Sequence, residues 1–202
     1  MIAICGRGES GKQIVSRSLR DHAGLRYTAS TSEHAVRFVR PALAERGIVY
    51  DTDLACWLDR RNHRETWRAE IEHYNLGDAA RMYREMAADQ DVLDGLRMPE
   101  DLAACRAEGI VSLAVWIERP GTVDASCRIR EEDCDVTIRN DGGVMEFVQK
   151  AVRFASNLRL PPKEKPQTEL TPLRYHKDEF GMYCWHAGNV DLMSGSPSAS
   201  TP

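Results

Sequence analysis

Residues 1–19 constrain the fold more than any other stretch of the chain. Residues 1–5 are apolar and predict one buried strand, residues 6–12 match the pattern G-x-x-x-x-G-K, and the apolar residues that follow recur at helical spacing. Backbone N–H groups of such a loop and the positive end of the next helix converge on anionic oxygens, while glycines let the backbone approach them. The order therefore predicts a P-loop. The residues expected to hold nucleotide phosphates are Gly6, Arg7, Gly8, Glu9, Ser10, Gly11, Lys12 and Gln13.

One position departs from the P-loop pattern. Gln13 stands where Ser or Thr would normally offer a hydroxyl to Mg²⁺. Lys12 supplies a mobile positive charge that can follow the β- and γ-phosphates. A structural turn is the alternative reading of the glycines, and it is disfavoured because the match directly follows a strand. We therefore expect a carboxylate elsewhere to serve the metal or to orient the acceptor.

Length and composition limit the class of protein. At 202 residues the chain has the length of one α/β domain with a tail. Its net charge of −4 argues against non-specific binding of nucleic acid but does not exclude a local basic groove. No apolar run approaches a membrane span, which predicts a soluble protein that engages no membrane. The six cysteines contain no C-x-x-C, so we expect free thiols in a reducing cytosol.

Segments with strand and helix patterns alternate along residues 1–158, which predicts an α/β fold of three layers around a mostly parallel sheet. Expected strands cover 1–5, 25–28, 47–50, 91–94, 110–117 and 135–140, and expected helices include 33–46, 78–88, 99–107 and 144–158. Residues 159–202 are rich in Pro, Lys and Ser, which predicts an extended, partly disordered C-terminal tail. Within that tail, residues 180–185 are apolar enough to dock, at a place that the sequence does not specify.

Acidic residues follow two of the expected strands. Asp51 and Asp53 come after the apolar stretch 47–50, so their carboxylates are expected at the carboxyl end of the sheet, beside the P-loop. There they would ligate Mg²⁺ or orient the acceptor hydroxyl; the alternative is that they cap the next helix. Asp94 ends the expected strand 91–94 and is the second candidate, with the alternative that it only ends the strand or caps a helix.

Residues 54–75 interleave arginines with aromatic side chains. This mixture suits an aromatic base and its phosphate, and the alternative is a solvated helix face. The candidate substrate contacts in this block are Arg61, His63, Arg64 and Trp67.

Further arginines follow the later strands. Arg97 lies just beyond a strand end and is placed to clamp an acceptor phosphate, unless it pairs with Glu100 or Asp101. Arg128 and Arg130 lie in a polar loop that the family resemblance given below implies to be a lid over the transferring group; a simply charged loop is the alternative.

Four segments, in this order and spacing, carry a family resemblance: Ile2–Gln13, Asp94–Arg97 with Glu100, Gly109–Gly121 and Asp135–Gly142. Together they resemble phage deoxynucleoside monophosphate kinases of the adenylate and thymidylate kinase group. They are also similar to P-loop kinases that phosphorylate the base hydroxymethyl group of 5-hydroxymethyluridine in phage DNA. The resemblance covers roughly residues 1–158 and implies a P-loop kinase domain there.

This resemblance implies ATP, Mg²⁺ and a role in phage nucleotide or DNA metabolism in the host cytoplasm. Phosphoryl transfer requires aligned reactants and neutralised charge. The catalytic candidates are Lys12, Asp51, Asp53 and Arg97, with Asp51 and Asp53 also at the metal.

The nature of the acceptor is the open question of the sequence. The arginine–aromatic block exceeds what one small phosphate needs, so we favour 5-hydroxymethyluridine in DNA as the acceptor. A free deoxynucleoside monophosphate is the alternative, and a non-catalytic nucleotide-binding module, supported by Gln13, is a further one. A GTPase is disfavoured because no N-K-x-D motif occurs, and a homodimer stays open.

Overall fold

The computed structural model describes residues 1–158 and the backbone of residues 174–177 and 183–186. The chain divides into two compact units, residues 1–163 and 164–202. In the second unit, β5 (Arg174–Lys177) pairs antiparallel with β6 (Tyr183–His186). The rest of the predicted tail, including the apolar residues 180–182, lies outside the described residues. In the described part of the chain, no helix has both the length and the apolar character needed to cross a bilayer.

A parallel sheet of four strands forms the centre of the first unit. Its strands, in the order β2-β1-β3-β4, are β1 (Ile2–Cys5), β2 (Val92–Asp94), β3 (Leu113–Glu118) and β4 (Val136–Arg139). Ile4 of β1 lies opposite Asp94 on one side and Val115 on the other. The carboxyl ends of β1, β2 and β3 therefore meet at one edge of the sheet.

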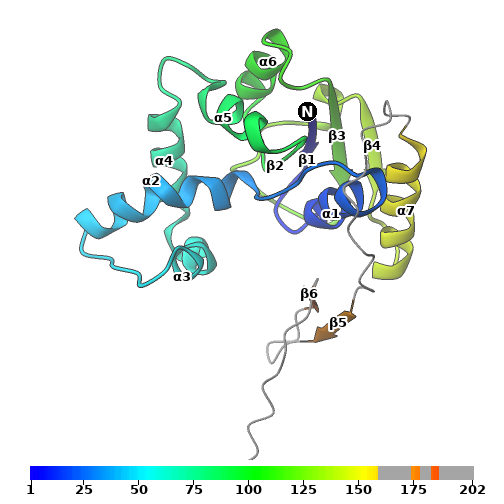
Figure 1. Cartoon of the computed structure of the whole chain (residues 1–202), viewed down its shortest axis with the longest axis horizontal. Helices are drawn as coiled ribbons and strands as arrows, with labels where there is room; N and C mark the ends of the chain where they lie inside the picture. The colour runs from blue at the N-terminus through cyan, green and yellow to red at the C-terminus, as the bar shows by residue number, and fades with distance from the viewer. Residues whose placement is uncertain (159–173, 178–182, 187–202) are drawn as a thin grey trace, which may run out of the picture. The chain divides into compact units, whose positions relative to one another are not determined.

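Alternate strand residues face separate hydrophobic clusters on the two sides of the sheet. Ala3, Cys5 and Trp116 belong to one cluster, and Ile4 and Val115 to the other. Figure 1 shows helices on both sides of the sheet. On one side lie α1 (Lys12–Ala23) and α7 (Val144–Asn157), and on the other lie α5 (Arg81–Asp89) and α6 (Pro99–Ala107). The predicted α/β fold with three layers and a parallel sheet is confirmed.

Residues 25–28, predicted as a strand, are not a strand. They run beside the start of β2, where the Arg26 carbonyl accepts hydrogen bonds from the Asp91 amide at 2.8 Å and from the Val92 amide at 3.3 Å. The chain then enters α2 (Thr31–Glu45), which Ser30 and Glu33 begin with a reciprocal capping box.

The second stretch wrongly predicted as a strand is 47–50. The backbone here bonds to α2 and not to a strand: the Ile48 amide donates to the Leu43 carbonyl at 3.0 Å, and Arg40 Nη2 donates to the Tyr50 carbonyl at 2.8 Å. Thr52 then begins α3, because its hydroxyl accepts a hydrogen bond from the Ala55 amide at 3.1 Å. A helical segment follows, in agreement with the alternative interpretation of residues 54–75 as a helix. Its elements are α3 (Asp53–Leu58), the 3₁₀ helix η1 (Asp59–His63) and α4 (Arg64–Tyr74). We call residues 53–74 the arginine block.

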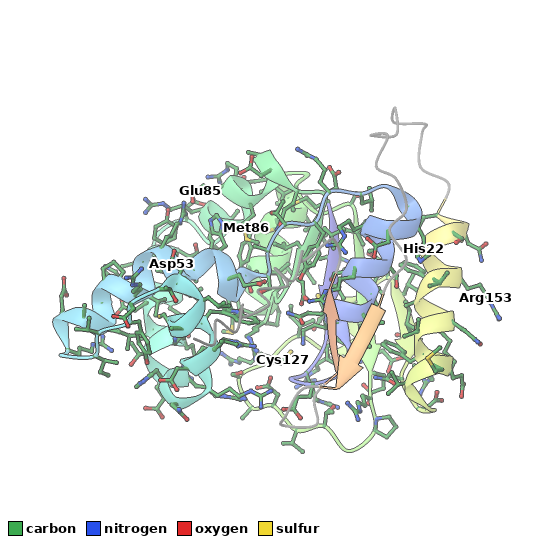
Figure 2. The ribbon with its side chains drawn as sticks, turned by 60° about the horizontal axis from the view of Figure 1, so that its bottom comes forward. His22, Asp53, Glu85, Met86, Cys127 and Arg153 are labelled. Atoms are coloured by element: carbon green, nitrogen blue, oxygen red, sulfur yellow. The ribbon has the colours of Figure 1, made fainter. Side chains whose placement is uncertain are left out.

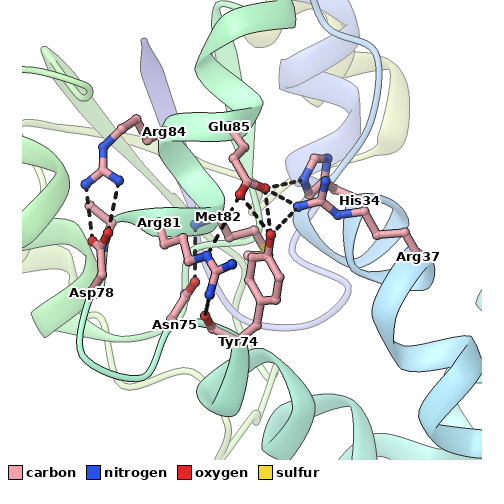
Figure 3. A network of polar contacts seen from close by, with 10 residues as sticks. His34, Arg37, Tyr74, Asn75, Asp78, Arg81, Met82, Arg84 and Glu85 are labelled. Carbon is pink, nitrogen blue, oxygen red and sulfur yellow. Dashed lines mark hydrogen bonds and ion pairs between the residues drawn. The ribbon is translucent and has the colours of Figure 1, made fainter.

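A polar network around Glu85 fixes the arginine block to α2 and α5 (Figure 3). Tyr74 Oη donates to Glu85 Oε1 at 2.8 Å, and Arg37 forms an ion pair with the same carboxylate. His34 Nε2 lies 3.8 Å from Glu85 Oε2. The Tyr74 ring stacks on Phe38 with 4.4 Å between the ring centroids. The network thus holds the end of α4 in place.

Candidate functional site

The loop between β1 and α1 leaves several backbone N–H donors without partners among the described residues. Gly11 has a φ of 103° and is the N-cap of α1, and no side chain caps this helix. Among the described residues, no group accepts a hydrogen bond from the amides of Arg7, Glu9 or Gly11. Amides without partners at a helix N-terminus carry partial positive charge. Such donors are the kind that anions accept hydrogen bonds from, and the predicted binding of nucleotide phosphates by this loop stays a prediction.

Close packing behind the loop fixes its shape. A Cβ added to Gly11 would lie 2.6 Å from Phe147 Cε1, and a Cβ added to Gly6 would lie 2.7 Å from Ser10 Oγ. Asn140 Nδ2 donates to the Ser10 carbonyl at 2.8 Å. Only glycine fits at these two positions without a displacement of its neighbours.

Lys12 lies over the loop. Its Nζ donates to the carbonyl oxygens of Gly6 at 3.0 Å and of Arg7 at 2.7 Å. Burial lowers the pKa of the Lys12 ammonium, while the nearby Asp94 carboxylate raises it. The ammonium is therefore held at the loop by two charge-assisted hydrogen bonds to backbone carbonyls.

Asp94 brings a buried carboxylate to the sheet edge at which the loop begins. It ends β2 next to Ile4 of β1, and it is 3% exposed. Tyr27 Oη donates to Asp94 Oδ2 at 3.3 Å. Burial raises the pKa of Asp94 to about 6, although the Lys12 ammonium lowers it in part. Asp94 is thus ionised at neutral pH and can still accept a proton from a reacting group.

Asp51 and Asp53, predicted at this edge of the sheet, are not placed there by the structure. The strand that would have carried them does not form, and Asp53 Oδ1 instead accepts a hydrogen bond from Arg40 at 2.7 Å, with its side chain 69% exposed. Cys127 marks the position of the loop, because its Sγ lies 3.7 Å from the Gly6 carbonyl. Figure 2 shows Asp53 beside the helices α2 and α3, well separated from Cys127. The structure gives this pair of acids no contact with the loop.

The arginine block reaches the P-loop through η1. Arg61 Nη2 lies 3.1 Å from Glu9 Oε1, which joins the block to the loop. The neighbouring Arg60 stacks on Trp57, with its guanidinium carbon 4.0 Å from the ring centroid, and its Nη1 donates to the Trp57 carbonyl at 2.9 Å. The block thus presents two arginines close to the phosphate-binding edge.

Arg60 is a half-buried cation among other cations. Burial is the largest cause that lowers the pKa of Arg60, and the guanidinium groups of Arg61, Arg64 and Arg97 lower it further, whereas Glu33 raises it. Within the described residues, neither Arg60 nor Arg64 forms an ion pair. The sequence analysis missed Arg60, although its spacing of three from Trp57 on a helix is a signal for stacking.

The other predicted members of the block have different surroundings. Trp67 is a core residue, 5% exposed and packed in the hydrophobic cluster above the sheet, so no base can stack on its face. His63 Nε2 lies 3.1 Å from Asp59 Oδ2, and its ring meets Tyr50 edge-on. The interpretation of Trp67 as a substrate contact is therefore corrected.

Arg97 pairs with neither Glu100 nor Asp101. Its Nη1 donates to Asp124 Oδ2 at 2.8 Å and also to Ser126 Oγ. The sequence analysis did not single out Asp124, because no local pattern links it to a loop more than a hundred positions away.

Arg128 and Arg130, predicted to close over the site, are both exposed. The Arg128 amide donates to the Arg97 carbonyl at 2.8 Å, which anchors the segment, but the Arg128 side chain forms no ion pair with any described residue. Arg130 Nη1 lies 3.4 Å from Glu132 Oε1, and its side chain is 76% exposed. The predicted contact of these side chains with substrate stays a prediction.

The residues around the loop limit how a metal ion can be held. The described part of the chain contains no cluster of three or more His, Cys, Asp or Glu residues suited to a metal ion. Gln13 offers a neutral amide oxygen in the first turn of α1, and Asp94 offers a carboxylate at the adjacent strand end. Any Mg²⁺ here would take most of its ligands from phosphates and water.

Comparisons with known proteins do not identify a family for this chain. No protein-family model matches the chain, and a search of curated proteins found no match. One similar solved structure is an unliganded sugar kinase from Janibacter sp. HTCC2649, with a TM-score of 0.40 and 16% identity over 75% of this chain and 91% of that chain. A likeness at this level carries no argument about activity.

Proposed function

We propose that the protein is a P-loop phosphotransferase that moves the γ-phosphoryl group of ATP to a nucleotide. One observation carries the proposal. A loop with a helix N-terminus that no side chain caps, a lysine bonded to that loop and a buried carboxylate meet at one sheet edge. The arginine block contacts the loop through the ion pair of Arg61 with Glu9.

The proposed roles follow from the contacts. The loop amides and Lys12 hold the phosphates of ATP, and the lysine exchanges its carbonyl partners for phosphate oxygens. Asp94 accepts a hydrogen bond from the acceptor hydroxyl and takes up its proton, for which a pKa of about 6 is suited. Because phosphoryl transfer passes through a loose transition state, positioning and charge neutralisation supply most of the catalysis.

Mg²⁺ belongs to this proposal as the ion that accompanies ATP. When bound, it would neutralise charge on the transferring phosphates. Because Asp94 takes up the proton of the acceptor, the chain offers the Gln13 amide oxygen to hold the ion. This donor set fits an ion that retains several water ligands.

The acceptor is proposed to be a free deoxynucleoside monophosphate. A half-buried guanidinium without a carboxylate partner is unfavourable unless an anion binds to it, and Arg60 is such a group. The preference for DNA in the sequence analysis relied on alternating arginines and aromatics along an open groove. With Trp67 in the core and Trp57 beneath Arg60, the block forms one anion site instead.

A second candidate acceptor is 5-hydroxymethyluridine in DNA. Arg64 and Arg128 favour it, because both side chains are exposed and form no ion pair with any described residue. Such free cations suit the backbone phosphates of a polymer.

The test is a transfer assay with the full chain. The protein is incubated with γ-labelled ATP, Mg²⁺ and either the four deoxynucleoside monophosphates or duplex DNA that contains 5-hydroxymethyluridine. We expect label on a mononucleotide. Label on DNA alone would replace the proposed acceptor by the second candidate. Binding of ATP without label on either would favour the non-catalytic module.

A further inference from the structure

The carboxylate of Asp124 contacts the P-loop at Gly8. Its Oδ2 accepts a hydrogen bond from the Gly8 amide at 2.8 Å. A Cβ added to Gly8 would lie 3.1 Å from the same oxygen, so the carboxylate sits where the absent side chain leaves room. The Asp124 side chain is only 3% exposed. This is an enclosed contact and not a surface one.

Arg97 and Ser126 complete the enclosure around this carboxylate. Arg97 Nη1 donates to Asp124 Oδ2 at 2.8 Å, and the Ser126 amide donates to Oδ1 at 3.1 Å. A loop amide and a guanidinium are the donors that phosphate groups take in proteins. Asp124 therefore has the partners of a bound phosphate.

The negative charge of Asp124 keeps other anions away from the Gly8 amide. Burial alone raises the pKa of Asp124, but hydrogen bonds from Ser126, Arg97 and the Gly8 amide outweigh it and hold that pKa well below its usual range. The group is thus an anion at any physiological pH. A phosphate and this carboxylate repel each other at the one Gly8 amide, so they cannot occupy it together.

The segment that carries Asp124 has room to move. Val123, next to it, is 93% exposed, and a Cβ at Gly121 would meet nothing within 4 Å. The segment is anchored further on, where the Arg128 and Ile129 amides donate to the Arg97 carbonyl. Its tip can therefore leave the loop while the anchor stays.

We propose that Asp124 is an internal occupant of the phosphate site, which nucleotide binding expels, and that its departure frees Arg97 for the acceptor. The inference rests on the proposed function for the identity of the anion. It makes the segment 120–127 a gate that keeps Arg97 paired until the phosphate donor has arrived. By linkage, a bound nucleotide then raises the affinity for the acceptor.

The test compares Asp124→Ala and Asp124→Asn with the wild-type full chain by titration calorimetry. ATP and inorganic tripolyphosphate are the probes, since the second reports on the loop without a nucleoside. We expect both variants to bind both probes about tenfold more tightly, because a competing charge-assisted hydrogen bond is gone. Unchanged or weaker binding would show that Asp124 supports the loop structurally and would overturn the proposal.

The matched control is Asp78→Asn. Asp78 also pairs with an arginine, Arg84 at 3.0 Å, but it lies away from the loop, and its substitution should leave both affinities unchanged. A tighter affinity in this control as well would mean that net charge alone explains the effect and would overturn the proposal.

Hydrogen exchange of the wild-type protein tests the movement even if the Asp124 variants fail to fold. Amides of residues 122–127 should exchange faster once tripolyphosphate is bound; slower or unchanged exchange would contradict the expulsion of Asp124. These results are independent of the proposed function. If the protein transfers no phosphoryl group, the affinities for ATP and tripolyphosphate and the exchange rates can still be measured.

Discussion

The P-loop edge and the arginine block differ in what holds them together. The loop rests on fully buried side chains, such as Val15 from α1 and Phe147 from α7. Across residues 53–74, only Cys56 and Trp67 are buried. Exposed partners hold that block instead, as in the ion pair between Arg40 of α2 and Asp53, whose side chains are 36% and 69% exposed.

This contrast indicates a division of labour. Elements with few buried apolar contacts open at low free energy, whereas elements in the core open only with global unfolding. The donor side of the proposed site is thus rigid and preformed, and the acceptor side can adjust around its substrate. Acceptor choice should therefore depend on the arginine block.

The largest expected effect is at Lys12. Lys12→Ala removes the cation that would neutralise the transferring phosphates, and kcat/KM for transfer should fall by about 10²–10³-fold. Steady-state kinetics with varied ATP measure it. Lys150→Ala is the control and should leave the kinetics unchanged. Lys150 lies on α7 and pairs with Asp141 and Glu146. A loss of kcat/KM below about tenfold in Lys12→Ala would contradict the assignment of the P-loop edge as the donor side of the site.

Gly11→Ala tests the rigidity of the loop. Its φ of 103° disfavours any side chain, and the added Cβ would also clash with Phe147. Gly77→Ala is matched, since Gly77 has a φ of 81° but nothing within 4 Å. The free energy of unfolding in urea should fall by about 2 kcal/mol more in Gly11→Ala than in Gly77→Ala. Equal losses would show that the packing behind the loop is loose.

Arg60→Ala tests the adjustable side. The KM for the acceptor should rise about tenfold or more, the scale of one charge-assisted contact, while the KM for ATP stays the same. Arg68→Ala is the control, because Arg68 is 62% exposed and pairs with Glu72 on the outer face of α4. A rise in the KM for ATP alone would assign Arg60 to the donor side.

The pH dependence tests Asp94, which lies between the two regions. If ionised Asp94 is required, kcat/KM should fall about tenfold per pH unit below its pKa of about 6. The stability effect has the opposite sign. Because the folded-state pKa exceeds the unfolded value, ionisation weakens the fold as the pH rises from about 4 to about 6. Asp94→Asn should therefore be more stable than wild type at pH 7 but equal to it at pH 3.5 in urea unfolding; equal stability at both would contradict the shift.

The smallest effect is expected at Tyr74. Tyr74→Phe keeps the ring that stacks on Phe38 but removes the hydroxyl that donates to Glu85, and it should destabilise the chain by about 1 kcal/mol. Tyr74→Leu, which also removes the stack, should be worse in the same urea unfolding experiment. The reverse order would show that the stack, and not the polar network, is dispensable.

Local signals in the sequence predicted the sheet and the loop. The apolar runs of β1 and β3 and the glycine spacing need no tertiary information, and α6 begins and ends at the predicted residues 99 and 107. The sequence alone did not identify which acidic residue lies beside the P-loop. An apolar run followed by an acid occurs at both 47–53 and 91–94, and only pairing with β1, seen for Asp94, selects the second.

Contacts between distant segments could not be predicted. Asp124 meets the loop across 116 positions, and no motif marks it. Trp67 and Trp57 look alike in a charged helical run, yet one is in the core and the other supports Arg60. Such differences depend on how the helices pack, which a single sequence does not encode locally.

The central claim is that the loop and the arginine block are the two halves of one phosphotransfer site. The most direct measurement is a single-turnover transfer of labelled phosphate from ATP to deoxynucleoside monophosphates, with wild type, Lys12→Ala and Arg60→Ala side by side. The account predicts labelled nucleoside diphosphate with wild type, almost none with Lys12→Ala, and recovery of the Arg60→Ala rate when the acceptor concentration is raised. Transfer by Lys12→Ala at the wild-type rate, or no transfer by the wild type to any mononucleotide, would contradict it.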